Sequence, residues 1–189
     1  MLRRFSPSPI RVDFVDGDTH GLAGRLGLTI APGRCDGLTR RDLTDDLRRL
    51  REDYRTDALV SLLEPHEYDW LGIARLPDAA RELGIDVLLL PIRDVSVPDS
   101  MSACQGTVRQ AVAAIKEGKT VVVHCRGGLG RSGLVAACCL VECGVEPDAA
   151  IEDVRRARPG AVETPEQEQF VRRYAEKLAK AAASPQEDT

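Results

Sequence analysis

Residues 120–133 read TVVVHCRGGLGRSG, and this stretch decides how the chain folds. Its beginning, Thr120–His124, is the most hydrophobic strand candidate, and Ser132–Cys143 carries the pattern of a helix. The three glycines between them allow successive backbone N–H groups to converge on one point and bind an anion. The stretch therefore predicts a strand, an anion-binding loop and a helix in direct succession.

The segments on either side of this stretch also alternate between strand and helix patterns. We expect further strands at 10–15, 24–30, 58–63 and 87–92, and further helices from Thr39 onward and at 67–83, 101–115, 147–157 and 164–183. The segment 67–83 forms either one helix or two helices broken near Pro77. Such alternation predicts an α/β fold with a central, mostly parallel sheet flanked by helices.

Length and composition exclude several classes of protein. A chain of 189 residues with 43% hydrophobic residues predicts one domain, over residues 1–183, with a disordered tail at 184–189. The net charge of −4 argues against a nucleic-acid binder, and no apolar run approaches the ~20 residues of a membrane helix. We find no secretory signal and no CxxC pair among six cysteines, so we expect a reduced, cytoplasmic protein without a metal.

The loop after the strand carries a pattern typical of nucleophilic catalysis. Cys125 ends the strand, and the beginning of the next helix adds its positive dipole end. Arg131 supplies a planar fork that suits two phosphate oxygens. A thiol over such a loop is expected to ionise to a nucleophilic thiolate. The alternative is a glycine-rich turn with a structural cysteine; a nucleotide-binding GxxxxGK[ST] loop is excluded because no lysine precedes Ser132.

The segment His124–Gly133 resembles the HCxxGxxR[ST] signature of the cysteine-dependent protein tyrosine phosphatase superfamily. The longer string HCRGGLGRSGLVAACCL resembles its dual-specificity branch, in particular the cyclin-dependent-kinase-associated phosphatase family. Shorter similarities occur at Leu26–Pro32, Pro91–Asp94 and Gly160–Thr164, so the resemblance covers roughly residues 24–180. It implies a single α/β phosphatase domain with no metal and no cofactor.

The resemblance also implies roles for the residues of the loop. Cys125 would attack phosphorus and form a cysteinyl-phosphate, and Ser132 would bond the sulfur and help it leave. His124 would lie buried and orient the backbone of the cysteine. The phosphate would be bound by Arg126, Gly127, Gly128, Leu129, Gly130 and Arg131.

Two aspartates are candidates for the acid that protonates the leaving group. In the related families this acid follows a strand about thirty residues before the cysteine, and Asp94 stands 31 positions before Cys125. Asp99 instead begins the helix at 101–115, where we expect it to act as N-cap. The resemblance thus favours Asp94. Further along, the T-x-x-Q segment that ends in Gln167 implies a glutamine that orients the hydrolytic water, although its threonine and proline are also ordinary helix-start signals.

We therefore expect a metal-independent phosphomonoester hydrolase that acts on phosphotyrosine in proteins, with phosphoserine and phosphothreonine as further candidate substrates. One alternative is a phosphoinositide phosphatase, although lipid-specific relatives carry extra lysines in a loop where this chain has only Arg126. Another is a non-catalytic phosphate-binding module, although the cysteine, arginine and acid are all present. We expect a monomer whose partner is a phosphorylated protein, with no nucleic acid and no membrane.

Overall fold

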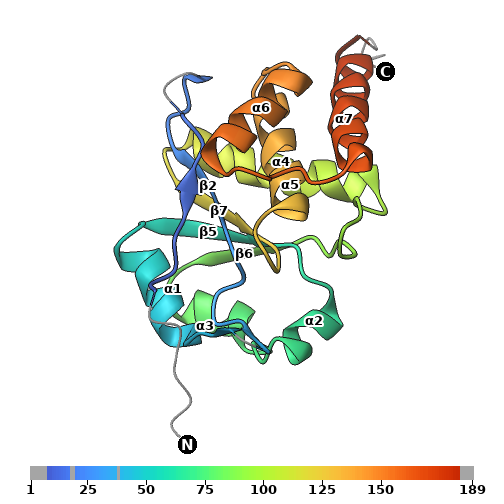
Figure 1. The fold of residues 1–189 in the computed structure, drawn as a ribbon. Coiled ribbons are helices and arrows are strands. Elements are labelled where there is room, and N and C mark those ends of the chain that lie inside the picture. Colours follow the sequence, from blue (N-terminus) through green and yellow to red (C-terminus); the bar gives the residue numbers. More distant parts are fainter. Residues whose placement is uncertain (1–7, 18–19, 38, 184–189) are drawn as a thin grey trace, which may run out of the picture.

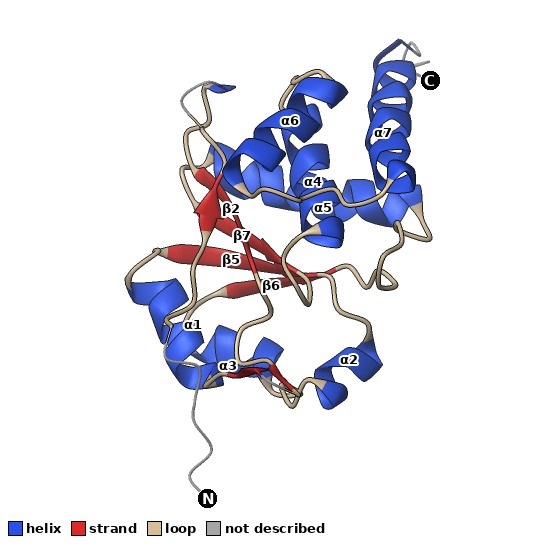
Figure 2. Cartoon of the chain, in the orientation of Figure 1, coloured by secondary structure: helices blue, strands red, loops and turns tan. Residues whose placement is uncertain are grey.

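The central sheet has five strands in the spatial order β1-β2-β7-β5-β6 (Figures 1 and 2). A computed structural model of the chain describes residues 8–17, 20–37 and 39–183. Strand β1 is antiparallel to β2, and all other neighbours are parallel. The strands are β1 (Asp13–Phe14), β2 (Arg25–Thr29), β5 (Thr56–Ser61), β6 (Asp86–Leu89) and β7 (Thr120–His124). A separate two-stranded sheet pairs β3 (Cys35–Asp36) with β4 (Thr39–Arg40).

Helices cover both faces of the sheet, as Figure 1 shows. One face carries α4 (Met101–Lys116), α5 (Gly130–Glu142), α6 (Pro147–Ala157) and α7 (Pro165–Ala183), and the other carries α1 (Leu43–Glu52) and α3 (Leu76–Glu82). The short helix α2 (Pro65–Trp70) follows the carboxyl end of β5. Strand β7 reads as a continuous apolar run because Val121 and Val123 pack on the α5 side and Val122 on the α1 side.

Helix α5 is the most deeply buried helix of the protein. Every residue from Gly130 to Val141 is buried, and the helix packs against α4, α6 and α7. Because β7 is the middle strand and α5 follows it directly, the loop that joins them is fixed at both ends by the core. The predicted succession of strand, loop and helix is therefore correct, and so is the α/β class with its mostly parallel sheet.

Three local predictions are wrong. The helix expected from Thr39 begins at Leu43, because Asp42 accepts the N–H of Asp45 as its N-cap while Thr39 pairs in β4. Ser100 rather than Asp99 caps α4, accepting the N–H of Ala103.

The strand expected at 10–15 is only two residues long, since β1 pairs with β2 at Asp13 and Phe14 alone. The segment 67–83, left open between one helix and two, forms the two helices α2 and α3. The tail predicted at 184–189 lies outside the described residues.

Within the described ranges, no helix is long and apolar enough to span a membrane, and no group of three or more His, Cys, Asp or Glu side chains could hold a metal ion.

Candidate active site

The thiol of Cys125 lies at the end of β7 and is 4% exposed. The backbone N–H of Gly128 donates to Sγ over 3.2 Å, and Ser132 Oγ lies 3.6 Å from the sulfur. Ser132 itself is fully buried in the first turn of α5. Both groups lie within donating distance of the sulfur when it carries a negative charge.

The loop shape requires glycine at one position in particular. Gly128 has φ +70°, and a Cβ there would lie 2.4 Å from the carbonyl oxygen of Thr29 at the end of β2. No side chain fits that space, so only a glycine lets the backbone of the loop pack directly against the end of β2. This contact turns the N–H of Gly128 toward the sulfur of Cys125.

Three donors from two other segments bind the carbonyl oxygens of the loop. The oxygen of Arg126 accepts from Ala31 N over 3.2 Å and from Arg34 Nη1 over 3.1 Å. The oxygen of Gly127 accepts from Arg158 Nη2 over 3.1 Å. The loop backbone is therefore held in place by the protein itself, before any anion binds.

Arg131 is 1% exposed and is held by acceptors from α2 and from the loop after β6. Glu67 accepts two bonds, from Nη1 over 2.7 Å and from Nη2 over 2.9 Å, and Ile92 O accepts from Nη1 over 2.9 Å. Burial opposes the charge, but the bonds and negative charges of its neighbours raise the pKa of Arg131, so it stays cationic. Its Nε is buried and has no hydrogen-bond partner among the described residues.

Glu67 is a residue that the sequence analysis missed. It lies in the first turn of α2 and is 4% exposed, and its Oε2 also accepts the backbone N–H of Glu64 over 2.8 Å as half of a capping box. Burial alone would raise the pKa of Glu67, but the bonds from Arg131 and Glu64 lower it. The only local signal was the capping box, which explains a glutamate here without any reference to Arg131.

Asp94 reaches the same place from the loop after β6. Its Oδ1 lies 2.9 Å from Arg131 Nη2, and its Oδ2 lies 3.8 Å from Arg126 Nη1. Half of its side chain is exposed, so the carboxylate lies at the mouth of the site. Arg126 in turn packs its guanidinium 4.6 Å from the ring centroid of Trp70.

A cavity of about 260 Å³ unites these groups. Asp94 lines it, whereas Asp99 is not among the described residues that do. Arg34 and Glu163 also line it, and neither was singled out from the sequence. The lining residues are Arg34, Asp94, Val95, Cys125, Arg126, Gly127, Leu129, Arg131 and Glu163.

His124 and Gln167 are both fully buried beside the cavity. His124 Nδ1 lies 3.3 Å from the carbonyl oxygen of Cys125, and its expected role in orienting the cysteine backbone stays a prediction. Burial lowers the pKa of His124 to about 4, so the ring is neutral near pH 7. The side chain of Gln167 bonds three backbone groups, and its expected role of orienting the hydrolytic water stays a prediction.

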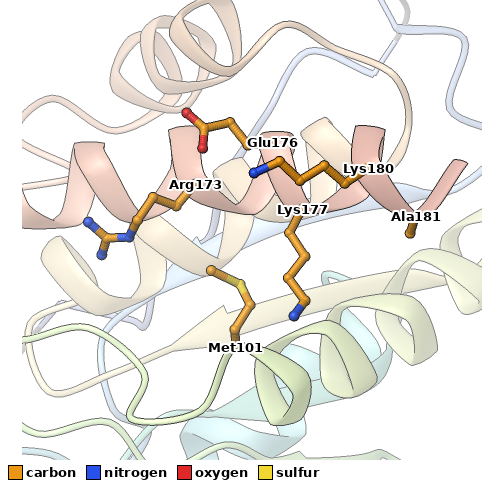
Figure 3. Close-up of a pocket in the computed structure, with 6 residues that line it drawn as sticks. All are labelled: Met101, Arg173, Glu176, Lys177, Lys180 and Ala181. Atoms are coloured by element: carbon orange, nitrogen blue, oxygen red, sulfur yellow. The ribbon is translucent and has the colours of Figure 1, made fainter. Parts of the chain in front are cut away.

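A larger cavity, of about 550 Å³, lies in the groove between the beginning of α4 and α7 (Figure 3). Its lining includes the cations Arg173, Lys177 and Lys180 together with Met101. It shares no lining residue with the cavity at Cys125. Size therefore does not identify the reactive site, whereas the convergence of thiol, arginine and carboxyl does.

Comparisons with known proteins agree with this geometry. A family model described as "Swiss Army Knife protein, DSP-PTPase phosphatase domain" matches residues 26–171. Cyclin-dependent kinase inhibitor 3 of Homo sapiens is 30% identical over 175 residues, which cover 91% of this chain and 82% of that protein. The protein of the same name from Rattus norvegicus is 29% identical over the same length and shares.

Solved structures give the same result. A kinase-associated phosphatase with its catalytic cysteine replaced by serine aligns with a TM-score of 0.85 and 27% identity, covering 92% of this chain and 98% of the other. Tk-PTP in its active form aligns with a TM-score of 0.66 and 33% identity, covering 88% and 97%.

These similarities confirm the resemblance drawn from His124–Gly133 and the enzyme class that it implies. They favour cysteine-based phosphatase activity over a phosphoinositide-specific enzyme or a non-catalytic module. Because the family model spans most of the chain, we conclude that the chain belongs to the dual-specificity branch of the cysteine-dependent protein tyrosine phosphatases.

Proposed function

We propose that this phosphatase dephosphorylates proteins through a phosphorylated Cys125. The observation that carries the proposal is the convergence of three groups on one cavity: the thiol of Cys125, the guanidinium of Arg131 and the carboxyl of Asp94. Phosphoryl transfer needs a nucleophile, positive charge around the equatorial oxygens and a proton for the leaving oxygen. One residue is available here for each requirement.

In the first step, the thiolate attacks phosphorus and the bond to the leaving oxygen breaks. Without substrate, Asp94 lies 2.9 Å from Arg131. A phosphoryl oxygen would replace the Asp94 carboxylate beside Arg131 when substrate binds. The displaced and protonated Asp94 would then donate its proton to the leaving oxygen. The unpartnered Nε of Arg131 and the backbone N–H groups of residues 126–130 would bind the other oxygens.

In the second step, water attacks the cysteinyl-phosphate and the sulfur leaves as a thiolate. Ser132 Oγ, 3.6 Å from Sγ, would stabilise that charge by donating its hydrogen. Asp94, now ionised, would accept the proton of the water. The groups of the chain suffice for both steps, so the proposal includes no metal and no cofactor.

The proposed substrates are phosphotyrosine, phosphoserine and phosphothreonine in proteins. Support comes from relatives named for kinases and from a loop whose only cation before Arg131 is Arg126. All six cysteines are free thiols, which fits the reducing cytoplasm. We propose a monomer that acts there without nucleic acid or membrane.

The experiment compares Cys125→Ser with Cys35→Ser, which removes an exposed thiol elsewhere. In EDTA, the wild type and Cys35→Ser should hydrolyse p-nitrophenyl phosphate at similar rates, and Cys125→Ser should not. Cys125→Ser should still bind phosphate and retain phosphoproteins from a lysate. Substantial turnover by Cys125→Ser would refute the covalent mechanism, and faster hydrolysis of phosphoinositide vesicles than of phosphopeptides by the wild type would refute the proposed substrate.

A further inference from the structure

Two valines beside the cavity adopt a backbone conformation that branched side chains rarely take. Val95, next to Asp94, has φ +60°, and Val162, next to Glu163, has φ +55°. Such conformations persist only where the surrounding structure holds them, and they cluster at functional sites. A contact that holds these two loops should therefore exist close by.

The side chain of Gln167 makes that contact. Its Oε1 accepts the N–H groups of Glu163 and Thr164 over 2.9 and 3.4 Å, and its Nε2 donates to the carbonyl oxygen of Ser96 over 3.2 Å. The side chain is fully buried in the first turn of α7. One amide therefore joins the loop after Val162 to the loop that carries Asp94.

The same amide also lies against the phosphate-binding loop. A Cβ on Gly130, the residue before Arg131, would lie 2.9 Å from Nε2 and 3.0 Å from Oε1 of Gln167. The glycine leaves room for this amide and for the carboxylate of Glu163, whose Oε2 would lie 2.3 Å from the same Cβ. The acid loop, the phosphate-binding loop and the start of α7 thus meet at one buried side chain.

We infer that Gln167 is a positioning residue for the general acid, acting through Ser96 and Val95 on Asp94. This inference rests on the proposed role of Asp94 as the proton donor. Oε1 of Gln167 already accepts two bonds, from Glu163 and Thr164, and Nε2 already donates one hydrogen to Ser96. Only the second hydrogen of Nε2 could therefore orient a water. Loss of the bond to Ser96 would let Val95 leave the left-handed region and would move Asp94 away from the leaving oxygen.

Two variants separate the contacts. Gln167→Glu keeps an acceptor for Glu163 and Thr164 but cannot donate to Ser96 when ionised, and Gln167→Met keeps the length without any bond. Both should slow hydrolysis of a phosphoserine peptide by about 10²-fold, the effect of a misplaced catalytic group, and should slow p-nitrophenyl phosphate much less. Gln105→Met, a buried glutamine in α4 outside the cavity wall, is the matched control and should leave this ratio unchanged.

A double-mutant cycle with Asp94→Asn tests whether Gln167 acts through Asp94. In the Asp94→Asn background, Gln167→Met should cause no further loss on the peptide, whereas an undiminished loss would overturn the inference. A burst of p-nitrophenol followed by slow turnover would also overturn it, because the water step would then be the one affected.

Hydrogen exchange gives a readout that does not depend on activity. The backbone N–H groups of residues 93–97 should exchange faster in Gln167→Met than in the wild type, and unchanged exchange there would overturn the inference. The proposed function fails separately, through residual turnover of Cys125→Ser.

Discussion

The guanidinium of Arg131 and the carboxylate of Glu67 form a two-point ion pair inside the protein, with side chains 1% and 5% exposed. The two bonds, of 2.7 and 2.9 Å, fix the plane of the guanidinium before any phosphate arrives. They occupy both terminal nitrogens on one edge, which leaves Nε as a donor without a protein partner. Glu67 therefore decides which edge of Arg131 a substrate can use.

Glu67→Gln should weaken both stability and catalysis. The amide keeps the shape but offers one oxygen where the carboxylate offers two, and it removes the buried counter-charge, so that only the half-exposed Asp94 remains beside the guanidinium. Breaking a buried ion pair costs about 3–5 kcal/mol, and the remaining bond should keep the loss near the lower value. Urea unfolding measures the loss of stability, and kcat on p-nitrophenyl phosphate should fall more than KM rises.

The matched control is Glu64→Gln, which changes the other half of the capping box in α2. It should cost far less, because Glu64 has no bond to Arg131. Equal effects of the two variants would show that Glu67 supports only the helix.

Arg131→Lys separates charge from shape. Lysine keeps the positive charge but cannot make two parallel bonds, either to Glu67 or to a phosphoryl group. We expect Arg131→Lys to recover little of the kcat lost in Arg131→Ala, as measured on p-nitrophenyl phosphate. Near-normal turnover with lysine would show that the charge alone is sufficient.

Asp94→Asn and Asp99→Asn test the source of the proton. A general acid helps a poor leaving group most, typically by about 10²–10⁴-fold in rate. Asp94→Asn should therefore slow the hydrolysis of phosphopeptides more than that of p-nitrophenyl phosphate, and it should flatten the fall in rate at high pH. Asp99, exposed and outside the cavity wall, should show neither effect when replaced. The reverse pattern would assign the acid to Asp99.

The buried ring of His124 should lower the free energy of unfolding in mild acid. Burial lowers its pKa to about 4 from 6.5, so the unfolded chain binds a proton in this window and the folded chain does not. Stability should therefore fall as the pH drops from 6.5 to 4, by about 3 kcal/mol in total.

Denaturant titrations of the wild type and His124→Gln at pH 7.5 and 5 measure the contribution of His124 to the free energy of unfolding. The wild type should lose more stability than the variant between the two values. Equal losses would mean that the ring takes up its proton without unfolding. The lowered pKa of Glu67 acts below 4.5, where its contribution to stability is lost as the pH falls further, so pH 5 keeps the two effects apart.

The sequence predicts elements best where local pattern and tertiary packing agree. Strand β7 and helix α6 have the predicted bounds, since the first is a continuous apolar run and the second starts at a proline in its first turn. The helix expected from Thr39 begins later because Thr39 and Arg40 pair with Cys35–Asp36, a strand pairing that the local helix pattern cannot reveal.

The active site shows the same difference between contacts local in the sequence and contacts made by tertiary packing. Cys125, Arg131 and Ser132 are close together in the sequence, so their meeting in the structure was predictable. Glu67 stands 64 positions from Arg131, and no periodicity links the two. The contact of Gln167 with Ser96 spans 71 positions and is equally invisible in the sequence.

The position of β7 in the middle of the sheet has a consequence for how the enzyme loses activity. Its five residues pair with β2 on one side and with β5 on the other, whereas β1 and β6 lie at the edges. Edges and exposed loops open at little cost, but a central strand opens only when the whole domain does. Fraying at the rim therefore leaves the thiol and its anion loop intact, and the loss of phosphate binding on heating should coincide with the cooperative melting of the core.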